Sequence, residues 1–322
     1  MLPYFPIQQD QYKMTMGTQA LNPELIIEVD RAHYQAELAL KADLLAEDHD
    51  YYVQAPTETL PLQWEVLELI LPLMARRYPA YFTLTVTGQC WHWQNKLLED
   101  ESTFRLGETE TLALSPLDWL GRQVQEDLLL LKEDTTNGMP LVAGHLCFPN
   151  DWCLEDKMGQ SFLSIHQPVP LFAEQIGRSS QLLLERLKIG RPVWRTNWAF
   201  KGSSRLNLTP RFAEEQRQSN QQITATTIGE RCFLRMERQT LSRLPHTRGI
   251  LFTVHTYQAP LMEEVHNPEQ VQRMLTILQT TPDAMMRYKN IAGFYEHLIA
   301  YLQQQLPVSQ VAQRDSKRQE RE

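Results

Sequence analysis

Apolar residues recur at helical spacing in several long stretches of the chain. Between residues 60 and 77 they fall three or four positions apart, which places them on one face of a helix. These positions are Leu62, Val66, Leu67, Ile70, Leu71 and Met74. The same spacing predicts further helices over residues 31–45, 116–131, 171–187 and 267–306.

Other stretches are rich in β-branched and aromatic residues or alternate apolar with polar ones, which is typical of strands. They cover residues 81–93, 141–148, 192–200, 232–241 and 250–257. The turn sequence RLPHTRG at 243–249 predicts that the last two strands form an antiparallel hairpin. Residues 203–229 contain few apolar residues, and we expect an excursion or a lid loop there.

This order of strands, short helices and three further strands indicates an α+β fold. We expect a curved antiparallel sheet with helices gathered on one face and a pocket beneath them. Residues 61–265 are expected to form the core. They are flanked by an N-terminal extension over residues 1–60, a C-terminal helical segment over 266–306, and a charged, disordered tail over 307–322.

Composition excludes some classes of function. The chain has 322 residues and a net charge of -8, which argues against nucleic acid or an anionic membrane as partner. No apolar run approaches the roughly 18 residues that span a bilayer, and the N-terminus has no secretory signal, so we expect a cytoplasmic protein. Cys147 and Cys153 lack the spacing of a zinc or redox pair, so the four cysteines are expected to be buried free thiols.

One histidine lies where a helix has to end. Residues 146–170 read LCFPNDWCLEDKMGQSFLSIHQPVP, and Pro168 disfavours a helical conformation at Gln167. His166 therefore occupies a last helical turn, with its ring aimed off the helix end. This placement suits an axial ligand of a metal or a haem iron. The alternative is a histidine that only hydrogen-bonds a local carbonyl group.

The predicted strand FLRMERQTLSRLP carries charged residues on both of its faces. Glu237 shares a face with Arg235, and Arg238 points the other way, so either face brings a charge inward. A buried charge has to be paired. Glu237 is therefore either the partner of Arg195 in an internal salt bridge or a carboxylate that lines a pocket and holds a cationic substrate.

His255, in LFTVHTY, shares a strand face with Thr253 and Tyr257. It is either a hydrogen-bonded core residue or a distal pocket group. The other histidines are expected to be structural or solvated: His33, His49, His246, His266 and His297 in polar or helical surroundings, His92 on a sheet surface, and His145 in the core or at an edge.

Several familiar catalytic motifs are missing from the sequence. It contains no GxGxxG after a strand, no P-loop, no HExxH and no GxSxG. We therefore do not expect this chain to bind a dinucleotide in the usual way.

A series of segments resembles the haem-dependent oxidative N-demethylase family. In order, they are LCFPNDWCLEDKMG, IHQPVP, RPVWRTNW, FLRMERQTLSRLP and ILFTVHTYQAPL. YKMTMGTQAL, IIEVD, GRQVQEDLLLL and MMRYKNI are also similar to that family. The resemblance spans roughly residues 10–290.

The resemblance implies a haem b held in a PAS-like fold, an antiparallel sheet with a helical cluster on one side. The proximal histidine of such a fold comes from the helix before the final three strands, and the residue in that place is His166. Arg195 and Trp198, within RPVWRTNW, are the other residues expected to bind the cofactor.

The reaction implied is the oxidation of an N-methyl group of a small secondary amine such as dimethylamine. Dioxygen is activated at the haem iron, and the products are formaldehyde and the shorter amine. Electrons come from NADPH through a separate flavin and iron–sulfur reductase subunit, which agrees with the missing dinucleotide motif. On this hypothesis Glu237 complements the ammonium charge, and His255 or Arg238 hydrogen-bonds dioxygen.

Two other interpretations remain open. A PAS-like haem-binding sensor would perform no catalysis and would need no carboxylate beside the open iron position. No kinase, cyclase or DNA-binding region is expected after the core, which argues against a sensor. The third interpretation is a divergent member that has lost haem and serves as a scaffold.

Overall fold

A seven-stranded antiparallel sheet forms the centre of the computed structural model, which describes residues 1–307. Its strand order is β1-β8-β9-β10-β6-β7-β2. The bounds are β1 Gln19–Ala20, β2 Val53–Gln54, β6 Asp127–Leu131, β7 Leu141–His145, β8 Val193–Lys201, β9 Phe233–Arg243 and β10 Ile250–Pro260. The structure thus confirms a mixed helix and antiparallel sheet fold, and it confirms the β9–β10 hairpin.

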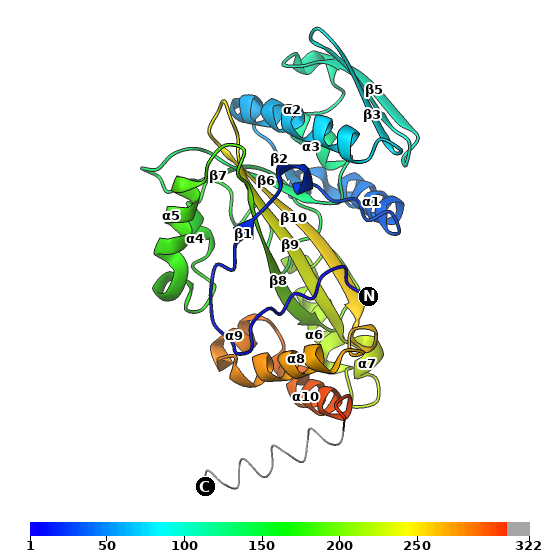
Figure 1. Ribbon diagram of the computed structural model, residues 1–322, viewed down its shortest axis with the longest axis vertical. Helices are drawn as coiled ribbons and strands as arrows, with labels where there is room; N and C mark the ends of the chain where they lie inside the picture. Colours follow the sequence, from blue (N-terminus) through cyan, green and yellow to red (C-terminus); the bar gives the residue numbers. More distant parts are fainter. Residues whose placement is uncertain (308–322) are drawn as a thin grey trace.

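Helices lie at both ends of the long strands β8, β9 and β10 and beside them (Figure 1). Their bounds are α1 Tyr34–Tyr52, α2 Leu60–Arg77, α3 Pro116–Gly121, α4 Phe162–Ile165, α5 Arg178–Arg186, α6 Ala213–Gln221, α7 Ile228–Arg231, α8 Pro268–Thr280, α9 Asp283–Tyr288 and α10 Tyr295–Gln304. A second sheet of three strands, β3 Phe82–Thr87, β4 Cys90–Asn95 and β5 Asp100–Arg105, extends beyond α2 and α3.

The six apolar positions predicted for the helix over residues 60–77 are all buried in α2. Pro61 occupies the first turn of α2, where its missing N–H has no intrahelical partner to lose. Burial of each large aliphatic side chain contributes about 1.5–3 kcal/mol, so this helix is stabilised mainly by tertiary packing.

The two faces of the central sheet pack against different helices. Leu128, Leu130 and Leu251 belong to the core cluster that includes α2, whereas Leu129 and Leu131 belong to the cluster beneath α4 and α5. A third cluster joins the lower ends of β8 and β9 to α8 and α10. The expectation that the helices gather on one face was therefore wrong, because both faces of these strands are apolar and each needs a cover.

Three other expectations need correction. Residues 81–93 form a hairpin rather than one strand, and Gly88, with φ of 60°, lies in its turn. The predicted helix over 116–131 ends with α3, and its last residues form β6, because a short continuous apolar run also fits a strand buried on both faces. The expected loop over 203–229 contains α6 and α7.

The N-terminal extension contributes to the central sheet. Its β1 pairs with β8 and its β2 pairs with β7, so residues 1–60 supply both edge strands. The C-terminal segment over 266–306 is helical, as predicted. Apart from Pro307, the tail predicted to be disordered lies outside the described residues. Within residues 1–307 no helix is long and apolar enough to cross a membrane.

Candidate functional site

A cavity of about 1030 Å³ lies between the central sheet and the segments that carry α4, α5 and α9. Its volume is near the upper end of the range for small-molecule pockets. One part of its wall is apolar and is formed by Leu129, Leu131, Leu141, Leu184, Leu241 and Phe252. Another part is polar and comes from β8, β9 and the residue after α9.

His166 lines this cavity from the end of α4. Ser161 begins the helix with a side chain that accepts a hydrogen bond from the Ser164 N–H at 3.1 Å, and His166 is the C-cap. Its Nδ1 lies 2.8 Å from the carbonyl oxygen of Phe162. A carbonyl oxygen can only accept, so Nδ1 carries the proton and Nε2 keeps its lone pair. The predicted helix end and the hydrogen bond to a local carbonyl group are therefore both present.

The surroundings of His166 keep the imidazole neutral and fixed. Burial lowers its pKa to about 4. The ring stacks on Phe172, with ring centres 4.4 Å apart and an interplanar angle of 14°. Within the described part of the chain, Nε2 has no hydrogen-bond partner. A neutral imidazole whose other nitrogen donates to a backbone carbonyl is the usual form of a histidine metal ligand.

The backbone just after His166 is strained. Leu171 has φ of 64°, a conformation that a bulky residue rarely adopts, and a π-helical turn follows at Ala173–Gly177. Both features are common at functional sites, where the surrounding structure compensates for their cost. Sequence analysis missed them because neither leaves a clear signal in the amino-acid sequence.

Glu237 lies on the polar wall. In the register of β8 and β9, Asn197 lies opposite Glu237 and Arg195 opposite Gln239, so all four side chains share one face. The carboxylate of Glu237 accepts hydrogen bonds from Asn197 Nδ2 at 3.2 Å and Gln239 Nε2 at 2.9 Å. Among residues 1–307, Arg195 has no carboxylate within 4.0 Å, so the expected salt bridge with Glu237 is not formed.

Arg195 and Trp198, the other two residues predicted to bind the cofactor, both line the cavity. The Nε of Arg195 is buried and has no hydrogen-bond partner in the described part of the chain. Trp198 contacts Lys289, a residue that sequence analysis did not identify. Lys289 donates a hydrogen bond to the carbonyl oxygen of Trp198 at 2.7 Å, and its ammonium lies 4.3 Å from the centre of the indole ring.

Burial lowers the pKa of Lys289 to about 8. Lys289 lies within MMRYKNI, a segment that the family resemblance includes, and this was the only signal that could have identified it. The N-terminal segment also lines the cavity, through residues 4–9 and 12–19 (dark blue in Figure 1). Only the tertiary structure brings this segment to the site.

A comparison with known protein families identifies the family of this chain. The family described as haem-dependent oxidative N-demethylase, alpha subunit-like, matches residues 17–299. The chain belongs to this family. The match includes His166, the polar wall and Lys289, and the description of the family names haem as the cofactor.

Arg238 and His255 do not line the cavity of this family member, although both were expected in a distal pocket. Side chains alternate along a strand, and Arg238 follows Glu237 directly, so it faces the other side of the sheet. On β10, Val254 lines the cavity and His255 points away. The expected contact of these two residues with dioxygen is therefore wrong.

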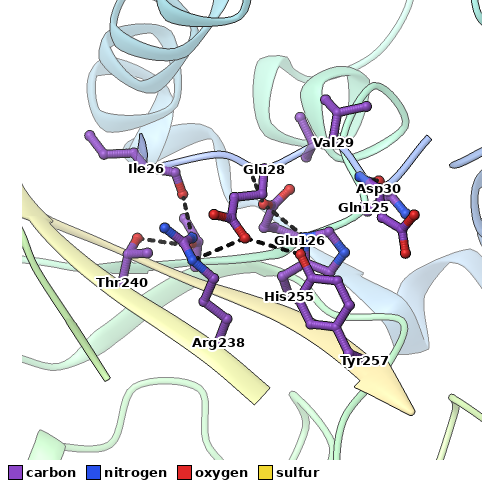
Figure 2. Close-up of polar contacts among 12 residues, drawn as sticks. Ile26, Glu28, Val29, Asp30, Gln125, Glu126, Arg238, Thr240, His255 and Tyr257 are labelled. Atoms are coloured by element: carbon purple, nitrogen blue, oxygen red, sulfur yellow. Dashed lines mark hydrogen bonds and ion pairs between the residues drawn. The ribbon is translucent and has the colours of Figure 1, made fainter. Parts of the chain in front are cut away.

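Both residues belong to a buried charge network on that opposite face (Figure 2). Arg238 Nε lies 3.2 Å from Glu28 Oε2, which also accepts a hydrogen bond from Tyr257 at 3.1 Å. His255 Nδ1 lies 3.2 Å from Glu126 Oε1. The backbone N–H of Glu28 donates to the same Glu126 oxygen at 2.8 Å. The network thus fixes the chain around Glu28 to the sheet. Of the two roles considered for His255, the structure shows the hydrogen-bonded core residue and not the distal pocket group.

We expect the substitution Arg238→Met to lower the free energy of unfolding by about 3–5 kcal/mol, because it leaves the Glu28 carboxylate, whose side chain is only 11% exposed, without its cation. Urea unfolding of the purified variant measures this loss. Adding Glu28→Gln to Arg238→Met should recover part of it by removing the unpaired charge. A double variant no more stable than Arg238→Met would contradict this account.

The pair of His255 and Glu126 predicts a pH dependence. Burial opposes charge on both groups, but their mutual attraction and hydrogen bond outweigh it. The pKa of His255 is therefore raised above 6.5, with Glu37 and Glu28 adding to the effect, and the pKa of Glu126 is lowered below 4.5. The histidine contribution is complete below pH 6.5 and is lost as pH rises through the folded pKa. The carboxyl contribution is complete above pH 4.5 and is lost as pH falls through the folded pKa.

The pair should therefore stabilise the fold most between pH 4.5 and 6.5. Urea unfolding from about pH 4 to about pH 9 should show a steeper decline above pH 6.5 in the wild type than in His255→Gln. Parallel profiles for the two proteins would rule out His255 as the titrating group.

Asp127, His145 and Cys147 form a second cluster of possible metal ligands, with ligand atoms within 4.8 Å of one another. The two carboxylate oxygens of Asp127 accept hydrogen bonds from the backbone N–H groups of Cys147 and Phe148, at 2.7 and 3.0 Å. The buried ammonium of Lys41 lies 4.0 Å from Asp127. Since a cation already occupies this position, we interpret the cluster as structural.

The cysteines agree with the expectation of free thiols. All four are unpaired, and Cys147, Cys153 and Cys232 are buried, whereas Cys90 is half-buried.

Proposed function

We propose that this chain is the haem-binding oxygenase subunit of an oxidative N-demethylase. It binds haem b in the large cavity and oxidises the N-methyl group of a small secondary amine, with electrons from a separate NADPH-dependent flavin and iron–sulfur reductase. The observation that carries the proposal is His166, whose unpartnered Nε2 belongs to a neutral imidazole of fixed tautomer in the wall of this cavity.

The residues around the cavity fit a haem group. The apolar wall beside His166 suits the porphyrin ring, and the Arg195 guanidinium, with its unpartnered Nε, suits a carboxylate held in the cavity. Trp198 adds an aromatic surface. We assign the PAS-like haem-binding core to residues 61–265, with β8, β9 and β10 as its final three strands and with β1 and β2 of the N-terminal extension at the edges of its sheet.

When bound, the haem supplies the oxygen chemistry, which none of these side chains can perform alone. His166 would hold the haem, and its hydrogen bond to the carbonyl oxygen of Phe162 keeps the imidazole ring oriented for that role. Glu237 complements the positive charge of the amine. Asn197 and Gln239 hold the Glu237 carboxylate in place through neutral amide groups, so its negative charge remains available to a substrate.

The position of Glu237 favours the enzyme over the haem-binding sensor. A sensor of a neutral gas needs no carboxylate in its pocket, whereas binding of an ammonium group does. The sequence motifs for binding a dinucleotide are missing, which is consistent with electron delivery by a partner subunit.

The purified chain, reconstituted with haemin, tests the proposal directly. We expect one haem per chain with a Soret band, and a spectral shift when the ferric protein is titrated anaerobically with small secondary amines. A chain that stays colourless after reconstitution would refute the proposed function. A haem protein whose spectrum does not change with any amine would instead support the interpretation as a haem-binding sensor.

A further inference from the structure

Positive charge is in excess around Lys289, where two further cations, Arg195 and Lys201, and two carboxylates, Glu237 and Asp151, act on its ammonium. Elsewhere in the cavity lining, Lys13 and Lys157 balance Asp127 and Asp156. Arg195 and Lys289 both line the polar wall of the cavity, and Glu237 is the carboxylate nearest to them in the sheet register. Asp151 also borders the cavity, but it is paired with Lys201 at 2.5 Å. The Asp127 carboxylate is bound by backbone N–H groups and lies beside Lys41, so it does not offset the excess either.

Neither Arg195 nor Lys289 has a carboxylate within 4.0 Å among residues 1–307. The Nε of Arg195 is buried without any hydrogen bond, and the hydrogen bond to Trp198 uses one of the three N–H groups of Lys289. Cations in a partly desolvated wall are costly unless an anion pairs with them. Two incompletely bonded cations beside one carboxylate therefore indicate a missing anionic partner.

We propose that Arg195 and Lys289 form a carboxylate-binding pair, and that the amine oxidised at this site is a secondary amino acid, an N-methylated amine that also carries a carboxylate. The inference rests on the proposed function and narrows its substrate class. Glu237 holds the ammonium group, and the pair holds the carboxylate. A dialkylammonium ion without a carboxylate would meet a wall with a net positive charge.

The register of the sheet supports this division of roles. Arg195 lies two residues before Asn197, which is opposite Glu237, so Arg195 and Glu237 belong to neighbouring rungs about 7 Å apart. Lys289 follows α9 and donates to the backbone carbonyl of Trp198 on the same strand, and the charges of both Glu237 and Arg195 act on its ammonium. A small zwitterion can therefore reach both charges at once.

A porphyrin propionate offers the same carboxylate chemistry, so the experiment separates the two sources. The variants are Lys289→Met, which removes the charge and keeps the length, and Lys289→Arg, which keeps the charge. Lys188→Met is the matched control, because Lys188 is exposed and does not line the cavity. Thermal unfolding establishes that each variant is folded.

In the first arm, haem-loaded proteins are titrated with N-methylglycine and with dimethylamine. We expect the wild type and Lys188→Met to bind N-methylglycine more tightly than dimethylamine. Lys289→Met should weaken N-methylglycine binding by about 10-fold or more, and it should tighten dimethylamine binding because it removes a cation from the wall. Lys289→Arg should retain most of the affinity for N-methylglycine. If Lys289 has a purely structural role, Lys289→Met should weaken the binding of both ligands alike, and that result would overturn the proposal.

In the second arm, the apo-proteins are titrated with haemin and with haemin dimethyl ester. Weaker binding of haemin alone in Lys289→Met would assign the pair to a propionate and overturn the substrate class. Equal binding of every probe in every variant would overturn the pair itself.

A separate calorimetric titration of the apo-protein with N-methylglycine tests the pair without haem. Wild-type protein that binds N-methylglycine but never acquires a Soret band would uphold the pair and refute only the proposed function. Wild-type apo-protein that binds haemin but shows no preference for N-methylglycine in either titration would overturn the substrate class and leave the proposed function standing.

Discussion

Replacement of His166 by alanine is expected to weaken haem binding by more than about 100-fold, with loss of the Soret band after gel filtration. Removing a partner that only orients a metal-bound histidine typically costs about 10–100-fold in affinity, so loss of the ligand itself should exceed that range. Haemin titration of the apo-protein, followed by the absorbance of the complex, measures the effect.

The matched control is His92→Ala. His92 is also half-buried and hydrogen-bonded, with Nδ1 2.9 Å from Thr103 Oγ1, but it lies on β4 of the second sheet and does not line the cavity. The substitution His166→Gly provides a further check, because added imidazole can occupy the space left by the side chain and should restore the Soret band. An unchanged spectrum and full haem content in His166→Ala would show that another residue binds the iron.

Glu237→Gln is expected to retain haem and to lower amine-dependent NADPH oxidation by about 100-fold or more in the presence of a reductase. The substitution keeps the shape of the side chain and removes its charge, so the site loses a charge-assisted hydrogen bond to the ammonium group. The value of kcat/KM for the amine is the quantity to measure.

Glu58→Gln, at an exposed position before α2, makes the same chemical change away from the cavity and should have no effect. Haem content by absorbance separates a defect in substrate handling from a loss of cofactor. Normal turnover in Glu237→Gln would exclude this carboxylate from the substrate site, and His166 could still be the haem ligand.

The polar wall shows how far strand periodicity can be taken. Alternation correctly placed Glu237 and Arg238 on opposite faces of β9, yet both were expected in one pocket. Only one face of a strand can border a given cavity. The structure assigns that face to Glu237 and directs Arg238 to Glu28, a residue more than 200 positions earlier in the chain.

Some features were determined by nearby residues alone. His166 ends its helix because the following prolines disfavour helical geometry, and α2 follows from the spacing of its apolar residues. The run of leucines in β6 was ambiguous, because a fully buried strand and a buried helix share the same apolar composition. Its pairing with β10 and β7 resolved that ambiguity.

The sequence by itself determined the α+β composition, the helix end at His166 and the alternation of faces along β9, because each depends on residues a few positions apart. Only the tertiary structure decided which face borders the cavity, that Lys289 and the N-terminal segment complete its wall, and that His255 belongs to the core. These outcomes depend on packing between segments far apart in the chain, and the local pattern of a segment does not specify its distant neighbours.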